Sequence, residues 1–142
     1  MELFVPINRI YTVSHLITAA SESLIRAGAD SIRRTLNLQS LFDDELDKNL
    51  KRLAAAQRQC TAIIVAHLQE LDHRDIAQRK AYPSLFAYCI KELRFSEDVA
   101  CRHILAVRAS RRFPSILAML ARGEINLTTI SVLNRHLTTE NH

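Results

Sequence analysis

Residues 41–72 read LFDDELDKNLKRLAAAQRQCTAIIVAHLQELD, which is 32 consecutive positions without glycine or proline. Ser40 precedes the stretch as a candidate N-cap. Asp43, Asp44 and Glu45 fall in the first turn, where the helix dipole favours negative charge. A segment with these start signals and no helix breaker predicts one long α-helix from about Leu41 to Asp72.

A stripe of eight positions, six of them apolar, runs along this helix at spacings of 4,3,4,3,4,3,4: Leu46, Leu50, Leu53, Gln57, Cys60, Ile64, His67, Leu71. We call this set the seam and expect it to form the spine of the core and to support self-association. Its two polar members, Gln57 and His67, either set the register of a partner helix or are exposed or hydrogen-bonded residues. A second periodic set between Ile10 and Leu24 predicts another helix within an N-terminal helical extension, residues 1–38.

The composition of the whole chain agrees with a helical fold. Only five of its 142 residues are Gly or Pro, whereas 17 are Ala and 19 are Leu. An all-β fold needs many more turn residues, and two glycines cannot build a glycine-rich phosphate loop. A hydrophobic content of 48% is enough for a packed core. The sequence therefore predicts an all-α, multi-helix bundle.

Positive charge accumulates toward the C-terminus. The net charge is +4 overall, and it rises from −2 over residues 1–46 to +2 over 47–100 and +4 over 101–142. Arg outnumbers Lys fifteen to four, and its planar guanidinium suits bidentate phosphate contacts. The sequence shows no membrane-spanning segment, no secretory signal and no paired cysteine pattern. We expect a cytoplasmic protein that does not enter a membrane.

Residues 84–112 have helix-turn-helix character. A short apolar helix is followed by a turn near Arg94 and Phe95, and then by a helix that Ser96 caps. The second helix has an apolar face, with four basic residues away from it or at its border: Arg102, Arg108, Arg111, Arg112. We expect these four arginines to contact DNA phosphates. The carboxylates of Glu97 and Asp98, on the same helix, would repel the DNA backbone. The alternative is an ordinary solvated face.

Residues 82–142 also resemble a known family region. The Ser96-capped helix with its arginines, the RRFP turn at 111–114, the LARGEINLT segment at 120–128 and the terminal HLTTENH are the similar features. They resemble the helical region that precedes the nuclease module in many bacterial HNH endonucleases, akin to the domain of unknown function called the thirteen-E-twelve repeat. The resemblance extends back to about Leu41, so it covers roughly 100 of the 142 residues. It implies a DNA-binding or DNA-positioning role.

This resemblance predicts a helical domain at residues 39–142 that stops before any nuclease module, with a frayed C-terminal tail as the alternative. The histidines are scattered, and Cys101 and His103 are two apart on one helix, so they point to different sides. We therefore expect no catalytic residue, no metal ligand set and no cofactor. The leading hypothesis is a non-catalytic DNA-contacting module. The alternative is a protein-interaction or homodimerisation module that uses the apolar seams.

Overall fold

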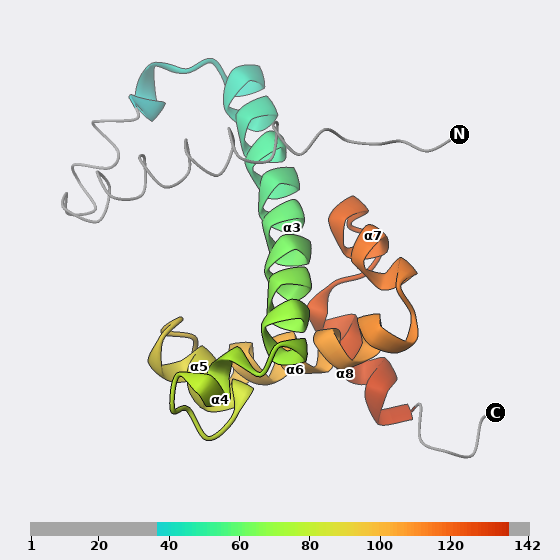
Figure 1. Ribbon diagram of the computed structural model, residues 1–142. Helices are drawn as coiled ribbons and strands as arrows, with labels where there is room; N and C mark the ends of the chain where they lie inside the picture. Colours follow the sequence, from blue (N-terminus) through green and yellow to red (C-terminus); the bar gives the residue numbers. More distant parts are fainter. Residues whose placement is uncertain (1–36, 137–142) are drawn as a thin grey trace. The chain divides into compact units, whose positions relative to one another are not determined.

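The computed structural model describes residues 37–136, and within them it contains six α-helices, one short 3-10 helix and no strand (Figure 1). The all-α prediction is confirmed. The elements are η1 (Leu38–Ser40), α3 (Asp43–His73), α4 (Ile76–Arg79), α5 (Leu85–Lys91), α6 (Glu97–Arg112), α7 (Ser115–Arg122) and α8 (Leu127–His136). Except for its last two residues, the predicted extension 1–38 lies outside the described residues, and so does the tail from 137 to 142. No helix in the described range has the length and apolarity needed to cross a bilayer.

The chain divides into two compact units, Met1–Asn49 and Leu50–His142. The described part of the first unit consists of η1 and the beginning of α3. The second unit contains the rest of α3 and helices α4 to α8. Its sequence carries fourteen basic and eight acidic side chains, a net charge of +6, whereas residues 1–49 carry −2. The positive charge of the chain therefore belongs to the second unit.

Side-chain caps decide where several helices begin and end. Ser96 Oγ accepts a hydrogen bond from the Val99 N–H at 3.4 Å, so this predicted cap is confirmed, and Ser84 Oγ caps α5 in the same way by accepting the Ala87 N–H at 3.1 Å. Gly123 ends α7 with a φ of 78°, a left-handed conformation that glycine adopts without strain.

The predicted Ser40 cap is wrong. Ser40 belongs to η1 rather than to the start of α3. At α8, Thr128 precedes most of the helix and is a capping residue type by sequence. The structure instead uses Asn126, whose Oδ1 accepts the Thr129 N–H at 2.8 Å. An Asn in this position caps a helix as well as a Thr does, and α8 therefore begins at Leu127.

The core of the second unit is built around α6, which contacts α5, α7 and α8. In Figure 1, α4 and α5 lie on one side of the C-terminal half of α3, and α7 and α8 lie on the other. Small side chains line much of the buried surface of α6 and let its neighbours approach closely. The core residues are, from α3, Ala62, Val65 and Leu68; from α5, Leu85 and Cys89; from α6, Ala100, Ala106, Val107 and Ala109; and, from α7 and α8, Leu120 and Ile130.

The prediction that the seam forms the spine of the core is wrong for the N-terminal half of α3. Leu50 and Leu53 are 64% and 65% exposed, and Leu46 is exposed as well. The fully buried residues of α3 begin only at Ala62 and lie on a neighbouring stripe. The reason is that the other helices of the second unit pack beside the C-terminal half of α3, where Ala62, Val65 and Leu68 join the core.

The connection between α5 and α6 spans residues 92–96. Within it Arg94 adopts a left-handed conformation, with a φ of 57°. The next residue donates its backbone N–H to the carbonyl of Cys89 at 3.1 Å, which closes the turn after α5. Arg94 therefore occupies a conformation that usually selects glycine. The likeness of this helix pair to a DNA-binding helix-turn-helix stays a prediction.

Candidate functional site

The four arginines predicted to contact DNA all lie on α6, but they do not share one face. At about 100° per residue, Arg108, Arg111 and Arg112 fall within an arc of about 100°, whereas Arg102 lies about 180° from Arg111. The structure therefore brings three of the four together near the C-terminal end of α6. It places Arg102 apart, toward the N-terminal end.

Arg102 is engaged with its own helix and with α8. Its guanidinium forms an ion pair with Asp98, one turn earlier on α6. Its Nη1 also donates to Thr128 Oγ1 at 3.3 Å. Asp98, expected to repel DNA phosphates, is thus partly neutralised by the neighbouring arginine.

Arg111 connects α6 to the C-terminal end of α3. Its Nη2 lies 2.7 Å from Asp72 Oδ2 and 3.4 Å from the backbone carbonyl oxygen of Gln69. The neighbouring Ser110 is buried and donates its hydroxyl to Gln69 Oε1 at 2.9 Å, so this polar contact continues into the core. Arg111 therefore has a structural role in addition to any contact with a ligand.

Arg108 and Arg112, like Arg111, are exposed. Arg108 is exposed and has no hydrogen bond or ion pair with another residue of the described range. The Arg112 guanidinium lies over the ring of Phe113, with Cζ 5.8 Å from the ring centroid.

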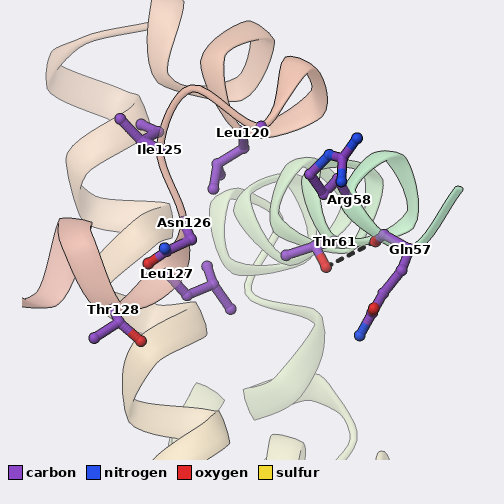
Figure 2. A pocket seen from close by; sticks show the side chains of 9 residues that line it. Gln57, Arg58, Thr61, Leu120, Ile125, Asn126, Leu127 and Thr128 are labelled. Carbon is purple, nitrogen blue, oxygen red and sulfur yellow. Dashed lines mark hydrogen bonds between the residues drawn. The ribbon is translucent and has the colours of Figure 1, made fainter. Parts of the chain in front are cut away.

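A pocket of about 360 Å³ lies between α3 and the turn that joins α7 to α8. Figure 2 shows Thr61 of α3 pointing toward Leu127, Arg58 lying on the same side as Leu120, and the Asn126 and Thr128 side chains pointing away from α3. The Thr61 hydroxyl donates to the carbonyl oxygen of Gln57 at 3.0 Å, drawn as the dashed line in Figure 2. Sequence reasoning missed this pocket, because its two walls are 59 or more residues apart in the chain and no local pattern connects them.

The histidines with described side-chain contacts are bonded to the helix backbone. Nδ1 of His103, which is buried, donates to the carbonyl oxygen of Val99 at 2.8 Å, and its ring packs against Phe95. His67, the polar interruption of the seam, donates from Nδ1 to the carbonyl oxygen of Ile63 at 2.8 Å. His67 is thus an exposed, hydrogen-bonded residue, one of the alternatives that the sequence left open.

Residues 37–136 contain no group of three His, Cys, Asp or Glu side chains that could hold a metal ion. Their three cysteines, Cys60, Cys89 and Cys101, are free thiols. Burial raises the pKa of the Cys89 thiol, which makes it a poorer nucleophile at neutral pH.

No family model, curated protein or solved structure matches this chain. The similarity of residues 82–142 to the helical region of HNH endonucleases therefore stays a prediction from the sequence. Two surfaces of the second unit remain as candidates for function: the arginines near the end of α6 and the pocket beside Arg58.

Proposed function

We propose that this chain is a non-catalytic helical module that contacts the DNA backbone through the solvent side of α6. The observation that carries this proposal is the grouping of Arg108, Arg111 and Arg112 within about one turn of helix. All acidic residues of α6 lie in its first turn, at the opposite end. Three basic side chains in one small area provide the electrostatic contact that a phosphate backbone requires.

The charge of the second unit supports the same proposal. Its net charge of +6 attracts a polyanion over distances longer than a single contact. With three phosphate contacts, binding would be weak and largely independent of base sequence, with a Kd of about 10⁻⁴–10⁻⁶ M at physiological salt. Such a module would position DNA for another activity rather than select a site.

The test is the salt dependence of DNA binding in the Arg108→Glu, Arg112→Glu double variant. Each neutralised phosphate contributes about 0.9 to the slope of log affinity against log salt, so the slope should flatten by roughly two. The matched control is Arg52→Glu with Lys91→Glu, which makes the same change of net charge at exposed positions outside α6. Equal loss of affinity in both variants would contradict the proposal, because only general charge would then matter.

A second candidate function is self-association through α3. Leu50 and Leu53 are about two-thirds exposed on one side of this helix, and exposed large apolar side chains at helical spacing suit a partner helix. Sedimentation at several protein concentrations tests this candidate. A dimer that the Leu50→Ser, Leu53→Ser variant dissociates would favour it, whereas DNA binding that survives in the same variant would keep the two functions separate.

A further inference from the structure

A second pocket of the second unit is lined by residues of α6, α7 and α8 and has a volume of about 120 Å³. Its wall includes Ile116, Met119 and Ile130, of which the last is buried. Phe113 and Leu133 also line it, and both are exposed. Large apolar side chains exposed beside an apolar pocket are typical of a surface that another molecule covers.

The volume of this pocket suits one side chain rather than a whole small molecule. Pockets for drug-sized ligands have volumes of about 300–1,000 Å³. An apolar cavity of about 150 Å³ accepts benzene, so a cavity of about 120 Å³ that opens at the surface suits a single phenyl ring. The occupant should therefore be a side chain that projects from the surface of a macromolecule.

The pocket carries positive charge at its edge. Arg112 lines it, with the guanidinium carbon 5.8 Å from the centroid of the Phe113 ring. Arg108, one turn earlier on α6, is exposed. No acidic side chain of the described range lines the pocket. A side chain that enters it should therefore be accompanied by carboxylates, which the arginines attract.

The chain itself carries such a side chain at Phe42, immediately before α3. Phe42 is 82% exposed, more than any other large apolar residue between 37 and 136. The next three residues are Asp43, Asp44 and Glu45, and all three are exposed. A phenyl ring followed by three carboxylates matches both the size and the charge of the pocket.

The exposed leucines of α3 match the pocket less well. Leu50 and Leu53 have Lys51 and Arg52 between them in the sequence, and these cations would be repelled by the arginine at the edge of the pocket. The net charges of the two units agree with this choice. Residues 1–49, which include Phe42, carry −2, whereas residues 50–142, which include the pocket, carry +6.

We infer that Phe42 of one molecule inserts into this pocket on a second molecule of the same chain, with the carboxylates that follow the ring beside Arg112. The contact joins two different surfaces, the start of α3 on one molecule and the α6–α8 pocket on the other, which makes it heterologous. It goes beyond the proposed function, because it requires neither DNA nor the pairing of Leu50 and Leu53 with a partner helix.

The test begins with sedimentation of the full chain at several concentrations in the absence of DNA. The wild-type chain should self-associate. Phe42→Ser should raise the apparent Kd at least about tenfold, because it removes the inserted ring and leaves every residue of the pocket in place. Leu50→Ser is the matched control. It removes another exposed apolar side chain near the start of the chain's long helix and should leave the Kd unchanged.

The second step tests whether one molecule supplies the ring and the other the pocket. Arg112→Glu should also weaken association, because its carboxylate would meet Asp43 and Asp44, whereas Arg52→Glu makes the same charge change outside the pocket and should not. A mixture of Phe42→Ser with Arg112→Glu should associate more strongly than either variant alone, since the first variant keeps the pocket and the second keeps the ring.

NMR provides a direct reading of the pocket. The chain has two methionines, Met1 and Met119, and Met119 lines the pocket, so a ¹³C-methyl label on methionine reports on it. Insertion of a phenyl ring should shift the Met119 methyl resonance increasingly with protein concentration, and Phe42→Ser should remove that shift. A shift that Phe42→Ser removes but that does not depend on concentration would place the ring of the same molecule in the pocket and overturn the inference.

Three sedimentation results would also contradict the inference: a wild-type chain that stays monomeric, association that Phe42→Ser leaves unchanged, or a mixture that associates no better than its components. Association that only Leu50→Ser weakens would assign the interface to the leucines of α3 instead. Far-ultraviolet circular dichroism of each variant verifies the fold. These outcomes are independent of the DNA proposal, which is read from the salt dependence of DNA binding.

Discussion

Arg58 on α3 and Gly123 at the end of α7 pack so closely that a Cβ at position 123 would lie 2.6 Å from Cδ and Nε of the arginine. Arg58 lies on a helix whose residues face the turn, and Gly123 adopts a φ of 78° that allows the turn to form. The contact thus couples the conformation of the α7–α8 turn to the position of a guanidinium.

Gly123→Ala should destabilise the fold. A left-handed conformation costs an L-residue about 1–2 kcal/mol, and the added methyl would also displace the end of the Arg58 side chain. Urea denaturation would measure the change in the free energy of unfolding. Because the arginine is flexible, most of the cost should persist in Arg58→Ala, Gly123→Ala relative to Arg58→Ala alone. A neutral effect of Gly123→Ala would contradict the left-handed turn.

Leu68→Ala should lower the free energy of unfolding by about 2–5 kcal/mol, because it removes buried methyl groups and leaves a cavity. Leu68 is only 3% exposed and belongs to the core. Leu53→Ala is the matched control on the same helix, and at an exposed position it should change stability by no more than about 0.5 kcal/mol. Equal effects in denaturation experiments would mean that the buried stripe of α3 is misplaced.

Arg94→Gly should stabilise the chain. Arg94 has a φ of 57° between α5 and α6, where glycine relieves about 1–2 kcal/mol of strain but loses part of that gain to the greater entropy of the unfolded chain. A net increase of roughly 0.5–1 kcal/mol in the free energy of unfolding is expected from these two terms. Arg94→Ala keeps the strain and should bring no such gain. A loss of stability in Arg94→Gly would argue against the left-handed conformation.

Stability should fall at alkaline pH through Tyr82. Its hydroxyl donates to Glu92 Oε1, and this hydrogen bond is the main reason why the pKa of Tyr82 is raised above its usual value of 10.0. A pKa that is raised in the folded state stabilises the fold below pH 10 and loses that contribution as pH rises through the folded pKa. Tyr82→Phe should therefore reduce the pH dependence of unfolding above pH 10. An identical alkaline profile in the variant would rule out this contribution.

Helix type and many boundaries were predictable from local chemistry. The serines before α5 and α6 and the glycine after α7 act through hydrogen bonds or φ angles of adjacent residues, which a sequence pattern can display. The buried side of α3 was not predictable in the same way. Leucines at regular spacing favour a seam at Leu50 and Leu53, but the position of the partner helices buries Ala62, Val65 and Leu68 instead.

The candidate sites, too, could be predicted only in part from the sequence. The arginines of α6 could be named from the sequence, but their partners could not, because Asp72 and Thr128 are far from Arg111 and Arg102 in the chain. The pocket beside Arg58 depends wholly on tertiary packing. A local sequence pattern cannot indicate which residues of a distant helix form the other wall of a pocket.

The native cysteines allow a spectroscopic reporter to be attached without introducing a new cysteine. Cys101 is exposed on α6, whereas Cys89 is fully buried and Cys60 is half-buried. A maleimide dye should therefore react first at Cys101, seven residues before Arg108 on the same helix. At about 1.5 Å of rise per residue, the dye would be attached roughly 10 Å along the helix from that arginine. Fluorescence quenching or anisotropy of the native chain would then follow ligand encounters at α6 in real time.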